Sequence, residues 1–312
     1  MKGKTLVEVI LTKTKGYSHE DINVAVARGL DDLNYDIRAH DSVFIKPNLC
    51  YYWDYSTGQT TDPRVVSAIV DWVRQRAGND VNIFVAESDA SAMRTKYAFT
   101  MLGFKKMARE KKLKLVNLSD GEIVEKEVYV AGERVVLPVN KLLLDGDLMI
   151  NVPKLKTHRT IGFTCALKNM FGIIAKRQKF LYHNRLAQTI VAINKIVATD
   201  IVVVDGIIVS GKTPKKMGII ITGNDALATD LVAAEIIGYK PSRVAYLKLA
   251  MKEGMGEAKN PNIIENPVGL KDVKKEFPKP NFLMESLSWR FQLRALKFYA
   301  KIVGDVIPPI LE

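Results

Sequence analysis

Several short runs of apolar residues restrict what this chain can fold into. DLMINVP (147–153) and DIVVVDG (200–206) are nearly continuously apolar, and DSVFIKPNL (41–49), VNIFVAES (81–88) and MGIIITGN (217–224) are similar. Such runs are typical of strands that are covered on both faces, as in a parallel sheet. Between these runs lie segments whose apolar residues recur at helical spacing. We therefore predict an α/β fold, with a mostly parallel sheet layered by helices.

Local signals mark the ends of several elements. Ser18 and Asp21 form a capping box at the start of a helix that runs to about Leu33. Asp62 followed by Pro63 is a second helix start. Further signals predict a helix at 97–111 that breaks near Gly103, a hairpin at 126–139 that turns at Ala131-Gly132, and a helix at 227–238.

The chain divides near residue 258. Residues 1–258 are expected to form the α/β core domain, and about 260–280, rich in Pro, Asn and Lys, is expected to be irregular. The stretch 283–310 predicts a C-terminal helical extension with a broad apolar face and basic flanks. Docking on the main body or on a second subunit is favoured, which leaves a homodimer open. Contact with a membrane surface is the less favoured alternative.

Composition excludes several classes of protein. No apolar run reaches the roughly 18–20 residues that span a bilayer, and the N-terminus lacks a signal-peptide cleavage site. The two cysteines, Cys50 and Cys165, are too few for a disulfide framework or a cysteine-ligated iron–sulfur cluster within one chain. We expect a cytoplasmic location.

The chain is basic, with 46 Lys and Arg against 34 Asp and Glu, a net charge of +12. That charge suits an anionic partner. The basic residues are scattered, and neither the P-loop nor the dinucleotide-binding glycine motif is present. We therefore expect no sequence-specific nucleic-acid binding, only weak salt-dependent association. A nucleic-acid-binding protein that uses the aromatic loop 51–55 for stacking remains an alternative.

Polar side chains follow the predicted strands where ligands bind in open α/β sheets, at the carboxyl ends. They are Lys46, Asn48, Glu87, Ser88, Asn151, Lys154 and Asp205. Turns prefer Gly, Asn, Asp and Ser over Lys, so the lysines are unusual there. We predict that Lys46, Glu87, Lys154, His158, Lys168 and Asp205 line one pocket.

The stretch 151–174 is the densest in polar residues. It is expected to leave a strand at Asn151, to form a loop with Lys154, Lys156 and His158, and to enter a helix near 163–164. A helix start beside lysines favours an anion such as a carboxylate or phosphate. Lys168 and Asn169 would lie on that helix.

Six blocks resemble an archaeal and bacterial family known only as domain of unknown function 362. They are KPNL (46–49), TTDP (60–63), INVPKLKTH (150–158), ALKNMFGI (166–173), VVDGI (203–207) and TDLVAAEIIG (229–238). The resemblance spans about 43–238. Many relatives carry a ferredoxin-like cluster segment, which a chain with two cysteines lacks.

A more distant resemblance is to lactate racemase and its nickel-pincer relatives. His158, Lys168 and His183 fall in the order of that family's catalytic histidine, cofactor-attaching lysine and nickel-binding histidine, at similar spacings. The racemases' double glycine before the lysine is replaced by Ala166-Leu167, and KPNL stands in place of their early Asp and Arg motif. The resemblance implies a common architecture, and we do not expect the pincer cofactor.

These residues favour an enzyme that uses acid–base chemistry on a small anionic substrate, a hydroxy acid or a phosphorylated metabolite. The reaction would be isomerase-like, racemase-like or lyase-like. His158 would transfer the proton, Lys168 would be a second base or a nucleophile, and Glu87 and Asp205 would orient them or bind a divalent cation. The substrate-binding residues would be Lys46, Asn48, Lys154, Lys156, Asn169 and His183.

Overall fold

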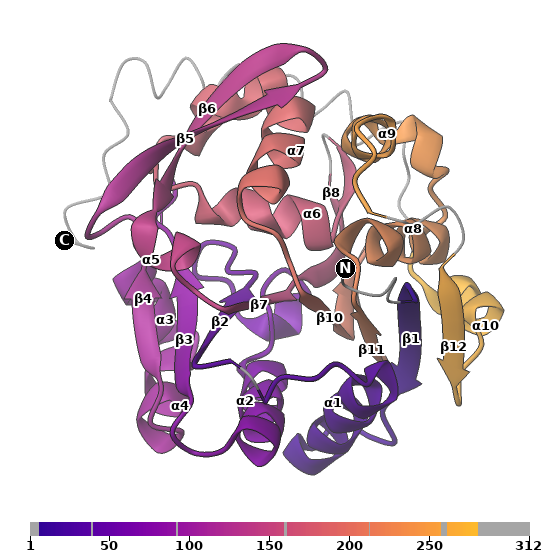
Figure 1. The fold of residues 1–312 in the computed structure, drawn as a ribbon. Coiled ribbons are helices and arrows are strands. Elements are labelled where there is room, and N and C mark those ends of the chain that lie inside the picture. Colours follow the sequence, from indigo (N-terminus) through magenta and orange to yellow (C-terminus); the bar gives the residue numbers. More distant parts are fainter. Residues whose placement is uncertain are drawn as a thin grey trace.

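A computed structural model of the chain describes residues 6–38, 40–91, 93–158, 161–211, 213–256 and 261–279. The predicted C-terminal helix at 283–310 lies outside the described residues. Strands and helices alternate along most of the chain (Figure 1). No helix in the described ranges is long and apolar enough to cross a membrane.

Ten of the described strands form one sheet, and two form a separate hairpin. The strands of the sheet are β1 (Glu8–Lys13), β2 (Ser42–Pro47), β3 (Asn82–Glu87), β4 (Lys114–Asn117), β7 (Leu148–Val152), β8 (Lys154–His158), β9 (Gly162–Thr164), β10 (Ile201–Ser210), β11 (Pro214–Gly223) and β12 (Asn262–Asn266). The hairpin joins β5 (Ile123–Val130) to β6 (Glu133–Asn140).

The sheet is mostly parallel, as predicted. Its main path runs β12-β1-β11-β10-β7-β2-β3-β4, and β8 pairs with β10 and β9 off this path. Strand β11 runs antiparallel to both β1 and β10, and β9 runs antiparallel to β8. The other pairings within the sheet are parallel.

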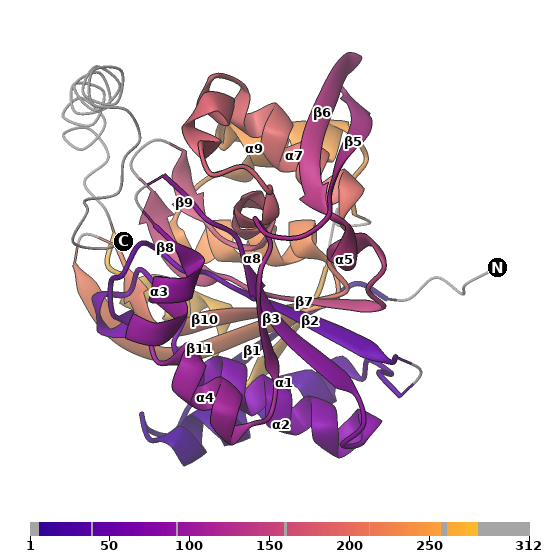
Figure 2. The ribbon, with the colours of Figure 1, turned by 90° about the vertical axis from the view of Figure 1, so that its left-hand side faces the viewer.

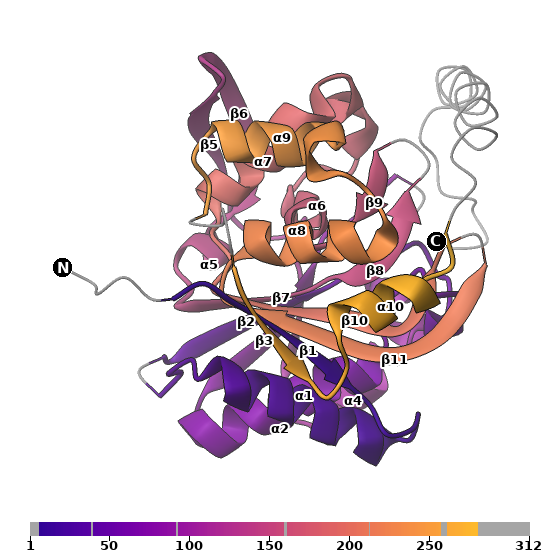
Figure 3. The same cartoon turned by 90° about the vertical axis from the view of Figure 1, so that its right-hand side faces the viewer.

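Helices cover both faces of the sheet (Figures 2 and 3). One face carries α1 (His19–Leu33), α2 (Pro63–Ala77), α3 (Thr95–Met101) and α4 (Phe104–Glu110). The other carries α6 (Ala166–Asn169), α7 (Leu186–Ile196), α8 (Ala226–Ile237), α9 (Ala245–Lys252) and α10 (Leu270–Glu276), and α5 (Lys141–Leu144) follows β6.

Alternation along the central strands builds two cores. In β1, Ile10 packs into one apolar cluster, whereas Val9 and Leu11 pack into the other. In β10, Val203 and Val204 divide in the same way. Because successive side chains of a strand point to opposite faces, a strand buried on both sides must be apolar at nearly every position.

The predicted local signals are confirmed. Ser18 Oγ accepts the Asp21 N–H at 3.1 Å, and the Asp21 carboxylate accepts the Ser18 N–H. Asp62 caps α2 with proline next in the chain. Gly103 separates α3 from α4 with φ +84°, and the β5–β6 hairpin turns at residues 131–132.

Three expectations about the segments 154–164 and 260–280 are wrong. Residues 154–158, expected as a loop, form β8, because the chain resumes an extended path after Pro153 and pairs with β10. The helix expected near 163–164 begins at Ala166, after the short strand β9. Within 260–280, β12 adds to the edge of the sheet beside β1, and α10 packs on the α8 side. Their short, polar sequences carry little periodic signal.

The buried strand faces should dominate the stability of the fold. Ile10→Ala removes a fully buried side chain and should lower the free energy of unfolding by about 2–5 kcal/mol. Val24→Ala on the exposed face of α1 is the control, and its effect should stay within about 0.5 kcal/mol. Urea unfolding followed by circular dichroism measures both. Equal effects of the two substitutions would contradict the two-sided core.

Candidate functional site

Strand register places the predicted polar residues next to one another at the carboxyl end of the sheet. In the parallel pairing of β2 with β7, Lys46 lies beside Asn151. In the pairing of β8 with β10, Lys154 lies beside Asp205. The chain after β7 therefore continues along β10 and carries its lysines past the ends of the other strands.

Lys46 and Glu87 form a buried ion pair, with 2.8 Å between Nζ and Oε2. Lys46 Nζ also donates to the Pro47 carbonyl at 2.6 Å, and the Ser88 N–H donates to Glu87 Oε1 at 2.9 Å. Gly172 passes close by. A Cβ atom there would lie 2.8 Å from Lys46 Nζ and 3.0 Å from Glu87 Oε1, so only glycine leaves this pair its room.

Lys154 and Asp205 form a second ion pair, with 2.7 Å between Nζ and Oδ2 and both side chains 0% exposed. Asp205 also accepts the Asp62 N–H at 2.7 Å and the Ile207 N–H at 3.0 Å. Burial raises the pKa of Asp205, whereas the Lys154 ammonium and the Asp62 N–H oppose that rise. The pair thus joins β8, β10 and the start of α2.

Lys156 is buried without a carboxylate partner among the described residues. Its Nζ donates to the Gln59 carbonyl at 2.6 Å and contacts the Cys50 side chain. Burial lowers the pKa of Lys156, Cys50 opposes this, and the charges of Lys154 and Lys46 add to the lowering.

Lys168 lies on α6, half-buried, with Nζ 4.1 Å from the centre of the Phe171 ring. Burial lowers its pKa to about 7, helped by the positive charges of Lys156, Lys46 and Lys179. These three lysines therefore lie within electrostatic range of Lys168.

His158 ends β8 and is half-buried. Burial lowers its pKa to about 3, with added effects from the charges of Lys168, Lys156 and His183. The imidazole is therefore neutral throughout the physiological pH range. His183 is exposed, and its ring centre lies 6.2 Å from that of Phe171.

Amide side chains fasten α6 to the sheet. Asn169 Nδ2 donates to the Lys46 carbonyl at 3.1 Å and to Asn151 Oδ1 at 2.8 Å, and Asn151 Nδ2 donates to the Ala166 carbonyl. Asn48 is held through its backbone, whose N–H donates to Thr61 Oγ1 at 2.8 Å. Its side-chain oxygen is buried and has no hydrogen-bond partner within the described structure.

Sequence reasoning missed Lys179. It begins the 3-10 turn Lys179–Arg185 and is buried, and its Nζ donates to Ser88 Oγ at 2.8 Å and to the Asp89 carbonyl. Burial lowers its pKa to about 8, Glu87 opposes this, and Lys46 adds to it. Because Lys179 follows no predicted strand, the rule that identified the other lysines did not reach it.

Asp230 on α8 was missed as well. Its carboxylate accepts the N–H groups of Ala166 at 2.6 Å and Leu167 at 3.2 Å, which fixes the first turn of α6. Burial raises its pKa to about 7, against the lowering effect of the hydrogen bond from Cys165. A detectable signal was present, since Asp230 lies inside the apolar helix ALATDLVAAEII and a buried acidic residue needs a partner.

The predicted residues thus fall into three groups. Eight meet at or near the lysines of β8 and α6: Lys46, Glu87, Lys154, Lys156, His158, Lys168, Asn169 and Asp205. Asn48 lies at the end of β2, beside them. His183 lies at the exposed margin, close enough to affect the pKa of His158.

The donor set does not fit a resident divalent cation. The described residues contain no group of three or more His, Cys, Asp or Glu that could hold a metal ion. Glu87 and Asp205 each bind a buried lysine instead.

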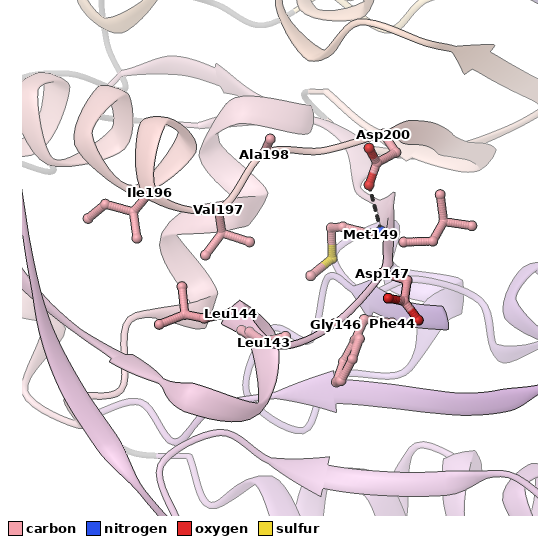
Figure 4. Close-up of a pocket in the computed structure, with 11 residues that line it drawn as sticks. Phe44, Leu143, Leu144, Gly146, Asp147, Met149, Ile196, Val197, Ala198 and Asp200 are labelled. Atoms are coloured by element: carbon pink, nitrogen blue, oxygen red, sulfur yellow. Dashed lines mark hydrogen bonds between the residues drawn. The ribbon is translucent and has the colours of Figure 1, made fainter. Parts of the chain in front are cut away.

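A cavity of about 210 Å³ lies elsewhere, at the amino ends of β2 and β7 (Figure 4). Phe44, Leu143 and Met149 line it, and the Asp200 carboxylate accepts the Met149 N–H there at 2.8 Å. Most of its lining residues are apolar, and it lies at the end of the strands opposite the lysines. The rule for open α/β sheets favours the lysine end.

Comparison with known proteins gives the family. A model of the domain of unknown function DUF362 matches residues 43–235. The chain belongs to this family. The thylakoid-associated protein sll1697 of Synechocystis sp. is 25% identical over 233 residues, which is 70% of each protein. The family blocks quoted from the sequence therefore carried a correct prediction.

Among solved structures, the lactate racemase apoprotein from Thermoanaerobacterium thermosaccharolyticum is similar, with a TM-score of 0.49 and 15% identity. The match covers 77% of this chain and 58% of the racemase, so the chain spans little more than half of that protein.

Removing the charge of one partner of the Lys154–Asp205 ion pair should strongly destabilise the folded protein. Asp205→Asn leaves the Lys154 charge buried and unpaired and should lower the free energy of unfolding by about 3–5 kcal/mol. Adding Lys154→Met should recover part of that loss, because the double variant holds no unpaired charge. Glu122→Gln, in the exposed pair with Lys141, is the control and should change stability little. A double variant less stable than Asp205→Asn would contradict this account.

The low pKa of Lys168 should make stability depend on pH. The pKa of Lys168 is 10.5 in the unfolded chain and about 7 in the folded protein. Between pH 7 and pH 10.5, the side chain is therefore protonated in the unfolded chain and mostly neutral in the folded protein. The contribution of Lys168 to the free energy of unfolding therefore rises with pH from about 7 to 10.5. In Lys168→Met, the rise measured by urea titration between about pH 6.5 and pH 9 should be smaller than in wild type. An unchanged slope would show that Lys168 titrates normally.

Proposed function

We propose that this protein is an enzyme that transfers a proton to or from a small anionic substrate, with Lys168 as the group that changes protonation. The observation that carries the proposal is a lysine with a pKa of about 7, held beside a neutral imidazole and two further buried lysines. A general base works best when its pKa is near the working pH.

The proposed roles reverse the order predicted from the sequence. The sequence favours His158 for proton transfer, since a free histidine has a pKa near neutrality. With a pKa of about 3, it is a poor proton acceptor at pH 7, and its neutral ring serves instead as a hydrogen-bonding partner for the substrate. The neutral amine of Lys168 is the stronger base of the two.

The surrounding charges suit such a reaction. When Lys168 Nζ takes a proton from a C–H or O–H group of the substrate, negative charge develops on a substrate oxygen. Lys156 lies near Lys168 and is buried, so its ammonium group stabilises that charge more strongly than it could in water. Returning the proton to the same or to another position completes an isomerase-like reaction.

A nucleic-acid-binding role is less well supported by the geometry. Lys46, Lys154, Lys156 and Lys179 are buried and cannot reach the phosphates of a duplex. The exposed aromatic pair Tyr51 and Trp53, with ring centres 5.6 Å apart, is the feature that fits stacking on bases. Because these four lysines are buried, they do not form a basic surface around the aromatic pair.

The proposal predicts proton exchange that depends on Lys168. Incubating the protein in D₂O with a panel of hydroxy acids and phosphorylated hydroxy or keto acids should give deuterium incorporation at one carbon of one compound, detected by NMR. The rate should rise with pH through about 7, as Lys168 loses its proton. Lys168→Met should lower it about 10²–10⁴-fold, the usual contribution of a general base.

Lys106→Met is the matched control, because this lysine lies on the exposed face of α4. It should leave the exchange rate unchanged. His158→Gln should lower the rate less than Lys168→Met, since the glutamine keeps a neutral hydrogen-bonding group. If Lys168→Met exchanges protons at the wild-type rate on the responding compound, Lys168 is not the base.

A further inference from the structure

We infer that the anionic group of the ligand carries two negative charges, as a phosphate monoester does, and that Lys156 and Lys179 bind it. This inference rests on the proposed function and deepens it. It decides between the two substrate classes that the sequence left open, a hydroxy acid with one negative charge and a phosphorylated metabolite with two.

Most of the buried carboxylates near the site already have a cationic partner. Two of the buried lysines, Lys46 and Lys154, are matched by Glu87 and Asp205. The neighbouring carboxylates are occupied as well. Asp62 binds Arg64 at 2.7 Å, and Asp89 binds Arg94 at 3.0 Å.

Lys156 and Lys179 form no ion pair with a carboxylate among the described residues. Lys156 Nζ donates to the Gln59 carbonyl and contacts the Cys50 side chain, and Lys179 Nζ donates to Ser88 Oγ and the Asp89 carbonyl. Their side chains are nonetheless buried, at 5% and 7% exposure. A buried charge without a partner of opposite sign is strongly unfavourable, so this arrangement is best satisfied by a bound anion.

Two buried threonine hydroxyl groups lie near Lys156. Thr164 lies directly opposite Lys156 in the pairing of β8 with β9, and Thr60 follows the residue whose carbonyl binds Lys156. The Oγ1 atoms of both threonines are buried and have no hydrogen-bond partner in the described part of the chain. A hydroxyl can donate to an anion oxygen, and buried polar atoms normally have partners.

Charge then selects the class of anion. A monocarboxylate would leave one of the two ammonium groups uncompensated. A phosphate monoester carries about −1.5 to −2 charges at neutral pH and has three acceptor oxygens. Lys156 and Lys179 both lie within electrostatic range of Lys168. One such group bound beside Lys168 can therefore neutralise both lysines and accept hydrogen bonds from the threonine hydroxyls.

The test uses inorganic phosphate and sulfate as dianions, with acetate and lactate as monoanions. Binding to the full-length protein is measured by isothermal titration calorimetry at constant ionic strength and about pH 8, where phosphate is mostly dianionic. We expect phosphate and sulfate to bind more tightly than acetate and lactate. Lys156→Met and Lys179→Met should each raise the Kd for phosphate about 10–100-fold, the loss expected for charge-assisted hydrogen bonds.

Controls separate the inference from the proposed function. Lys106→Met should bind phosphate as wild type does. Lys168→Met should still bind phosphate while losing proton exchange. Circular dichroism of each variant checks folding, and Lys156→Gln and Lys179→Gln replace either methionine variant that misfolds.

Two results would overturn the inference. If lactate or acetate binds as tightly as phosphate, the site holds a monoanion, and the proposed acid–base function stands without the dianion. If phosphate binds equally well to wild type and to both lysine variants, its site is elsewhere. Loss of deuterium exchange in wild type across the whole panel would instead count against the proposed function.

Discussion

The Lys154–Asp205 ion pair holds together the parts of the molecule on which the site depends. Asp205 lies in the centre of β10, Lys154 starts β8, and the N–H of Asp62 at the start of α2 donates to the same carboxylate. Two charges with no exposure are tolerable only when their remaining hydrogen-bonding positions are filled. Backbone N–H groups fill them here, so the strand pairing and the position of α2 are set by one carboxylate.

Continuation of the chain from β7 into β8 follows from that pair and explains the concentration of lysines. Once Lys154 is fixed beside β10, Lys156 and His158 follow at every second residue, and alternate residues of a strand share a face. The return through β9 brings α6 back beneath them, where Asp230 fixes its first turn. Lys168 thus lies within electrostatic range of Lys156, with β8 and α6 each held in place by a separate carboxylate.

Much of this arrangement could be predicted from the sequence because its signals are local or topological. The capping box at Ser18, the cap at Asp62 and the turn at Gly103 depend on neighbouring residues alone. The pairing of Lys46 with Glu87 follows from the rule that parallel strands end at one edge.

The remainder depends on contacts between distant segments. Lys179 reaches Ser88 and Asp89, about ninety residues away, from a stretch that reads as an ordinary basic loop. The strand β8 exists because of its pairing with β10, which no periodicity within five residues can reveal. The relative basicity of His158 and Lys168 could not be predicted either, since the free side chains suggest the opposite order and burial decides it.

That reversal has a consistent physical cause. Placing several lysines in a poorly solvated space lowers the pKa of every basic group there, because each proton adds a charge that its neighbours repel. A histidine, which starts near 6.5, is driven far below neutrality, whereas a lysine, which starts at 10.5, arrives near 7. A site that must bind an anion and also provide a base at neutral pH therefore gains from using lysine for both purposes. In the proposed reaction, the same positive charges that attract the anionic substrate also lower the pKa of Lys168, the base.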